Sequence, residues 1–257
     1  MKIRLWQFSD THLLSDPDGE LYGCRTGESL RTVLDDARSR IQPEDLVVVT
    51  GDLVHDESEQ GYQTLVDMFE ILGVPVFCLP GNHDDPALLR SLLQTGTVRY
   101  VPEFTTNGWQ FFFLDSTVHG MVAGRLDETS CRALTEGLQL HPDRHAAIFL
   151  HHPPLATGMA WLDNGQILEN PQQLFQITDA FPRVRAVCWG HAHVASEAMR
   201  NEVRMLGCPS TMVQFRPGCR EFSLDPVAPG YRWLDCFSDG STETGIIRLP
   251  AVNQPMT

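Results

Sequence analysis

Basic side chains are scarce in this sequence. It has 19 Lys and Arg residues against 33 Asp and Glu residues, which gives a formal net charge of −14 at pH 7. Proteins that bind DNA, RNA or anionic membranes rely on clustered Lys and Arg to neutralise phosphates. We therefore expect neither a nucleic acid polymer nor a membrane as partner. A small phosphate ester fits better, because bound divalent ions can reverse the sign of the charge in a site.

Paired cysteines and long apolar runs are also missing. The seven cysteines are odd in number and form no C-x-x-C pair, so we expect reduced thiols in a cytoplasmic protein and no disulfide framework. No stretch approaches the roughly 18 apolar residues of a membrane-spanning helix. The first residues alternate as a strand does, which is not the pattern of a signal peptide. The sequence has no internal repeat or low-complexity segment.

Short strand-like runs alternate with helical patterns, which is typical of an α/β protein. We expect strands at 3–8, 46–49, 76–79, 109–114, 146–150 and 184–189. We expect helices at 29–41, 60–72, from 86 onward, 128–138 and 172–181. The predicted architecture is two packed mixed sheets with helices on the outer faces.

The pattern changes after residue 195. Short strand candidates follow at 202–206, 231–237 and 244–249, separated by Gly, Pro and Ser-Asp-Gly turn signals. We expect these strands to be antiparallel and to close a second sheet. Residues 1–257 are then a single domain, with a motif-bearing core to about 194, C-terminal strands to about 249 and a tail at 250–257.

Five motifs fall at strand ends or in the loops that follow them. They are Asp10-Thr11-His12, Gly51-Asp52, Gly81-Asn82-His83-Asp84, His151-His152 and Gly190-His191-Ala192-His193. Ligands of open α/β sheets bind beyond the carboxyl ends of the strands. The side chains offer carboxylate, amide and imidazole ligands, which suit Mn²⁺, Fe²⁺ and Zn²⁺. An extended backbone in D-x-H and H-x-H puts both side chains of each pair on one side.

The ordered signature D-x-H, G-D, G-N-H-D/E, H and G-H-x-H resembles the calcineurin-like metallophosphoesterase superfamily. The resemblance implies a four-layer α/β/β/α sandwich with a dinuclear metal centre. One ion is then held by Asp10, His12, Asp52 and His193, and the other by Asp52, Asn82, His151 and His191. Iron and manganese, divalent or mixed-valence, are the expected ions, with cobalt and zinc as alternatives.

A narrower resemblance, to the bacterial class III 3′,5′-cyclic AMP phosphodiesterases, covers nearly the whole chain. It is carried by residues 50–54, 79–84, 161–163, 209–215, 222–225 and 228–232. It implies hydrolysis of 3′,5′-cyclic AMP to 5′-AMP by a metal-bridging hydroxide. Alternatives are another substrate, such as a 2′,3′-cyclic nucleotide, a glycerophosphodiester or a phosphomonoester, and a non-catalytic scaffold. The presence of every ligand and of the histidine after Asn82 argues against the scaffold.

The remaining site residues receive roles as hypotheses. His83 is the candidate general acid for the leaving 3′ oxygen, with a simple phosphate contact as the alternative, and Asp84 is expected to orient its imidazole. The expected substrate contacts are Asn82, His83, His193, Trp161, Gln214 and Phe215, the last three at the base unless they are core residues. His152 is expected to point away, and His55, His119, His141 and His145 to be structural or surface groups. A role for His55 or Asp56 beside the metal ligands stays open, as does the oligomeric state.

Overall fold

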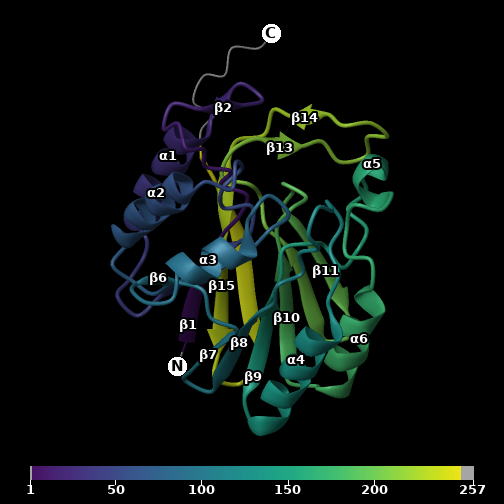
Figure 1. The fold of residues 1–257 in the computed structure, drawn as a ribbon. Coiled ribbons are helices and arrows are strands. Elements are labelled where there is room, and N and C mark those ends of the chain that lie inside the picture. The colour runs from purple at the N-terminus through teal and green to yellow at the C-terminus, as the bar shows by residue number, and fades with distance from the viewer. Residues whose placement is uncertain (1, 250–257) are drawn as a thin grey trace.

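The structure is a computed structural model that describes residues 2–249. Two six-stranded mixed sheets pack face to face (Figure 1). The first has the strand order β16 (Thr242–Arg248), β15 (Gly230–Phe237), β1 (Lys2–Phe8), β4 (Leu46–Thr50), β5 (Val76–Leu79) and β6 (Val98–Arg99). The second has the order β11 (Ser196–Arg200), β12 (Val203–Gly207), β10 (Val184–Trp189), β9 (His145–Phe149), β8 (Trp109–Phe113) and β7 (Glu103–Thr106).

Helices cover the outer face of each sheet (Figure 1). The first sheet carries α1 (Thr26–Arg38), α2 (Glu59–Glu70) and α3 (Pro86–Leu92), and the second carries α4 (Glu128–Leu140) and α6 (Pro171–Ala180). Side-chain caps fix where several of them begin, since Ser58 accepts from the backbone N–H of Gly61 and Asp127 from that of Ser130. The predicted four-layer α/β/β/α sandwich is therefore confirmed.

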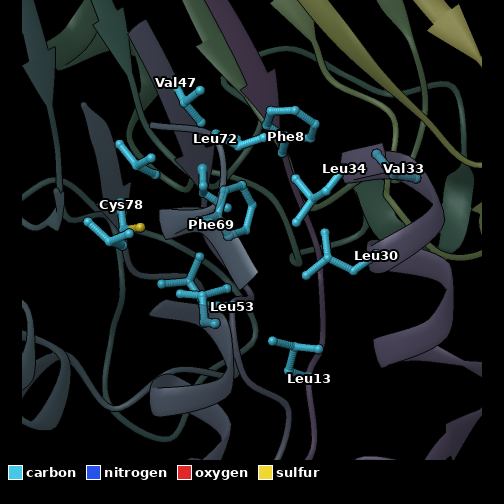
Figure 2. Packing of buried hydrophobic residues seen from close by; sticks show 14 of the residues in the cluster. Phe8, Leu13, Leu30, Val33, Leu34, Val47, Leu53, Phe69, Leu72 and Cys78 are labelled. Carbon is cyan, nitrogen blue, oxygen red and sulfur yellow. The ribbon is translucent and has the colours of Figure 1, made fainter. Parts of the chain in front are cut away.

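Apolar side chains fill the spaces between the four layers. On the first sheet, Phe8 and Val47 meet Leu30 and Leu34 of α1 and Phe69 of α2 (Figure 2). A separate cluster joins the inner faces of the two sheets. Burial of each such side chain contributes roughly 1.5 to 3 kcal/mol to stability, so the sheets hold a firm frame for the loops at their ends.

The carboxyl ends of the central strands emerge at one end of the molecule. Strands β1, β4 and β5 are mutually parallel, as are β8, β9 and β10. The Gln7 side-chain amide links the two sets, because its Nε2 donates to Thr50 Oγ1 at 3.0 Å and to the Trp189 carbonyl at 3.2 Å. The loops that carry the five motifs therefore meet at a single place.

The C-terminal strands differ in part from the prediction. The strand predicted at 202–206 does join the second sheet as β12, where it pairs parallel with β10, but the strands predicted at 231–237 and 244–249 extend the first sheet instead. β15 pairs antiparallel with β1, with Trp6 opposite Trp233, and β16 pairs with β15. Alternation along these segments predicts strands but does not say which open edge they cover.

Several short elements escaped prediction. They are β6, β7 and β11, together with β2 (Glu20–Leu21), β3 (Cys24–Arg25), α5 (Ala160–Asp163), β13 (Gln214–Phe215) and β14 (Leu224–Asp225). In Figure 1, β2, β13, β14 and α5 gather at the top of the molecule, at the end where β1 finishes. The predicted tail at 250–257 lies outside the described residues, and none of the described helices is long and apolar enough to cross a membrane.

Candidate metal centre

Most of the predicted metal ligands have an unusual backbone conformation. Five of them lie at positive φ, namely Asp10 (55°), His12 (44°), Asp52 (48°), His191 (62°) and His193 (48°). Each such residue costs on the order of 1 to 2 kcal/mol, and strain of this kind collects at functional sites. The predicted extended backbone in D-x-H and H-x-H is therefore wrong, and the side chains of each pair converge because the chain turns sharply there.

Asp52 lies between two groups of ligands. Its Oδ2 is 3.5 Å from His12 Nε2 and 3.3 Å from His151 Nε2. Its Oδ1 accepts a hydrogen bond of 3.0 Å from the backbone N–H of His83. One carboxylate oxygen thus faces both groups, while the other is held by the loop after β5.

The other predicted ligands complete the two groups. His193 Nε2 lies 3.2 Å from His12 Nε2 and 3.5 Å from Asp10 Oδ1. On the other side of Asp52, His151 Nε2 lies 3.2 Å from His191 Nδ1 and 3.3 Å from Asn82 Oδ1. The structure therefore brings together all seven side chains that the sequence singles out as ligands.

Hydrogen bonds fix which ring nitrogen of three histidines faces the centre. His151 Nδ1 donates to the Thr50 carbonyl at 2.8 Å, and His193 Nδ1 donates to the Val213 carbonyl at 2.8 Å. His191 uses Nε2, which donates to the Gln166 carbonyl at 2.7 Å. Each bond directs the opposite nitrogen inward, the orientation that a metal ligand requires.

The charges of the site also suit cations. Burial lowers the pKa of His191 to about 3 and that of His193 to about 4, so both are neutral at pH 7. Burial opposes ionisation of Asp52, but the neighbouring His151 and His12 hold the pKa of its carboxyl well below the usual range. No Lys or Arg within residues 2–249 pairs with Asp10 or Asp52. A buried carboxylate needs a positive partner, and a divalent ion fits this donor set.

Asp84 has different partners from the predicted one. Its carboxylate accepts hydrogen bonds of 3.0 Å from the backbone N–H groups of Leu53 and Val54, of 2.8 Å from Gly81 N–H and of 3.0 Å from the Tyr62 hydroxyl. In the described part of the chain no hydrogen bond joins it to the His83 imidazole. Asp84 instead braces the loops after β4 and β5, which carry two of the predicted ligands.

His83 and His55 lie side by side at the centre. Their rings stack with centroids 4.4 Å apart, and both line the cavity in front of the ligands. His55 Nδ1 also lies 3.2 Å from His12 Nδ1. The sequence left a role for His55 beside the metal ligands open, and the structure places it there.

The other histidines have different places. His152 is buried against His151 and His191, but its two ring nitrogens contact Ser116 Oγ at 2.8 Å and the Val122 carbonyl at 3.0 Å. Both nitrogens are thus occupied away from the centre. The cavity lining does not include His119, His141 or His145.

The cavity has a volume of about 200 Å³ and an aromatic wall. Of the residues predicted at the base, Trp161 and Phe215 line it, and the Phe215 ring stacks on His193 with centroids 4.0 Å apart. Gln214 does not line it, because its Nε2 donates to the carbonyls of Ser210 and Met212 at 2.8 and 3.3 Å. The prediction that Gln214 contacts the base therefore lacks support.

Two packed mixed sheets with a cluster of Asp, Asn and His side chains beyond their strand ends define a metallophosphoesterase. Residues 3–195 match the Calcineurin-like phosphoesterase family, and the chain belongs to it. It is 38% identical over 249 residues to the 3′,5′-cyclic adenosine monophosphate phosphodiesterase CpdA of Escherichia coli K12, covering 96% of this chain and 90% of that protein. It is 35% identical over 251 residues to the 3′,5′-cyclic-nucleotide phosphodiesterase alr5338 of Nostoc, covering 97% and 94%.

A solved structure shares the fold at low identity. The dimetal phosphatase of Danio rerio superposes with a TM-score of 0.66 at 17% identity, covering 96% of this chain and 98% of that one. Its likeness supports the sandwich architecture alone, since one fold hosts many functions.

Proposed function

We propose that this chain hydrolyses 3′,5′-cyclic AMP to 5′-AMP at a centre of two metal ions. The observation that carries the chemistry is the position of Asp52 Oδ2, 3.5 Å from His12 Nε2 and 3.3 Å from His151 Nε2. An oxygen in that place can bridge two cations. The choice of substrate rests on similarity over almost the full chain to relatives named for this reaction.

The proposed ions are iron or manganese, with cobalt or zinc as alternatives. Asp10, His12, Asp52 and His193 would hold one, and Asp52, Asn82, His151 and His191 the other. When bound, such ions lower the pKa of water towards about 7 and neutralise charge on the phosphoryl oxygens. The hydrogen bonds from His151, His191 and His193 to backbone carbonyls keep the ligand nitrogens aimed inward before any ion binds.

His83 is the proposed general acid. The reaction forms a bond from phosphorus to a water oxygen and breaks the bond to the ribose 3′ oxygen, which then needs a proton. The His83 imidazole lines the cavity and makes no hydrogen bond within residues 2–249, so its N–H is free to donate a proton to this oxygen. Positioned acids contribute about 10² to 10⁴-fold. Asp84 takes part as a positioning residue, because it braces the loops on either side.

The substrate contacts follow from the cavity. Asn82, His83 and His193 are proposed at the phosphate, and Trp161 and Phe215 beside the base. A small cyclic nucleotide as partner belongs to the same proposal. So does a cytoplasmic location, which the seven unpaired cysteines support.

The test is an assay of purified protein reloaded with Mn²⁺ or Fe²⁺. It receives 3′,5′-cyclic AMP, 2′,3′-cyclic AMP and bis(p-nitrophenyl) phosphate in parallel, and products are separated by chromatography. We expect preference for 3′,5′-cyclic AMP with 5′-AMP as product, loss of activity in Asp52→Ala and wild-type activity in the exposed control Asp143→Ala. His83→Ala should keep its metal and lose about 10² to 10⁴-fold in turnover.

Two results would change the proposal. Cleavage of the generic diester alone would keep the metal chemistry and move the substrate to another phosphodiester. Failure to cleave any of the three would refute the enzymatic function.

A further inference from the structure

Large hydrophobic side chains are exposed at the mouth of the cavity. Tyr22, Val122 and Phe222 line it, with 58%, 47% and 43% of their surface accessible. Exposed apolar groups gathered at a cavity mark a binding surface. The metal chemistry requires none of the three, so their presence there needs a separate explanation.

Tyr22 is poorly suited to its place in the backbone. The paired residues Leu21 and Cys24 enclose a two-residue turn in which Tyr22 has a φ of 52° and Gly23 a φ of 74°. Hairpin turns with two positive φ angles favour Asn-Gly or Asp-Gly, and a bulky first residue is strained. Since its ring is also more exposed than buried, neither the turn nor the packing explains a tyrosine here.

Phe222 connects Tyr22 to the rest of the aromatic wall. It lies in the loop between β13 and β14, with its ring centroid 5.2 Å from Tyr22, 5.3 Å from Trp161 and 5.3 Å from Phe215. Phe215 in turn stacks on the metal ligand His193. Aromatic rings thus follow one another from the metal centre to the opening of the cavity.

Two features of the wall describe its occupant. No Lys or Arg within residues 2–249 lines the cavity, so this part of the site suits a flat, uncharged group. The indole N–H of Trp161 is buried without a hydrogen-bond acceptor in the described part of the chain. A buried donor of this kind calls for a partner, and a ligand with an acceptor atom in a planar ring supplies one.

We propose that Tyr22 and Phe222, together with Trp161, form a nucleobase subsite. The base stacks on the Tyr22 and Phe222 rings. Stacking on aromatic side chains is how proteins hold nucleobases of any kind. A ring nitrogen or carbonyl oxygen of the base accepts from Trp161. This inference rests on the proposed function, since it concerns the part of the cyclic nucleotide that does not react.

The test compares substrates with and without a base. Manganese-loaded wild-type protein and variants receive 3′,5′-cyclic AMP and the abasic ribose 3′,5′-cyclic phosphate. We expect Tyr22→Ala and Phe222→Ala each to raise KM for cyclic AMP about tenfold, with KM for the abasic compound and the metal content unchanged. Tyr22→Phe should behave as wild type, and Trp161→Phe should raise KM for cyclic AMP alone.

Two further variants guard against misfolding and general surface effects. Tyr22→Asn relieves the turn, so it should melt at or above the wild-type temperature and still bind cyclic AMP as weakly as Tyr22→Ala. Met199→Ala removes a side chain as exposed as Tyr22, 58% accessible, on β11 outside the cavity. It should leave KM for both substrates unchanged.

A binding measurement separates this proposal from the proposed function. Calorimetry on the manganese-loaded protein should show 5′-AMP binding about tenfold more tightly than ribose 5-phosphate, with the difference lost in Phe222→Ala. That result without turnover of cyclic AMP would sustain the subsite and overturn the proposed function. Equal affinities in the wild type, or equal effects of the variants on both substrates, would overturn the subsite even if cyclic AMP is hydrolysed.

Discussion

The imidazole of His55 should control how tightly the His12 side of the centre holds its ion. Three of the ligand histidines donate their outer N–H to a backbone carbonyl, but the outer nitrogen of His12 lies 3.2 Å from His55 Nδ1. In His55→Ala that nitrogen loses its only hydrogen-bond partner within residues 2–249. Nothing then fixes the orientation of the buried His12 ring, so either of its two nitrogens can face the metal centre.

The expected magnitude follows from the bond that is lost. One hydrogen bond contributes roughly 0.5 to 1.5 kcal/mol, and removal of such outer partners typically weakens metal binding 10- to 100-fold. Since His12 keeps its other contacts, we expect about a tenfold loss of affinity. In His55→Gln the amide oxygen can still accept, so most of the affinity should return.

Calorimetric titration of the metal-free protein with Mn²⁺ measures this directly. We expect one of two binding events to weaken in His55→Ala while the other keeps its wild-type affinity. His119→Ala, which removes an exposed histidine outside the cavity, serves as the control. Two events with wild-type affinity in His55→Ala would refute the reasoning.

Two further predictions concern the loops and the protons of the centre. A Cβ at Gly81 would lie 2.2 Å from Asp52 Oδ1 and 2.8 Å from His151 Cε1, so Gly81→Ala should lose bound metal in elemental analysis, and full metal content would contradict the packing. Burial acts to lower the pKa of His151, but Asp52 outweighs it and raises that pKa to about 9 in the metal-free protein. His151 is therefore protonated at pH 7, and metal binding should release this proton and strengthen up to tenfold per pH unit between pH 7 and 9. Calorimetry in two buffers of different ionisation enthalpy checks this, and binding without proton release would contradict it.

The sequence predicted the core strands and the gathering of the seven proposed ligands, the strands for a physical reason. Segment 76–79 is a continuous apolar run and segment 184–189 is apolar apart from Arg185, and the structure has strands with the same bounds. Because central strands of each sheet run parallel, the polar residues after them must meet at one edge of that sheet. Asp10 and Asp52 could thus be brought together without coordinates, whereas His151 follows a strand of the other sheet and was joined to them only by the family resemblance.

What failed depended on contacts between segments far apart in the chain. The sequence around Asp84 does not reveal its hydrogen-bond partners. Its bond to Tyr62 forms only because α2 packs beside the loop that carries Asp84. His55 meets His12 across 43 positions. Tyr22 follows the two-residue strand β2, and Phe222 lies shortly before the two-residue strand β14. Strands of this length are too short to show any periodicity.

The ligand set is divided between the two halves of the sandwich. Asp10, His12, Asp52 and Asn82 follow strands of the first sheet, whereas His151, His191 and His193 follow strands of the second. Each proposed ion would take ligands from both sheets and act as a cross-link between them. Separating the sheets would then require release of the ions, so resistance to unfolding would rise with the free metal concentration of the surroundings.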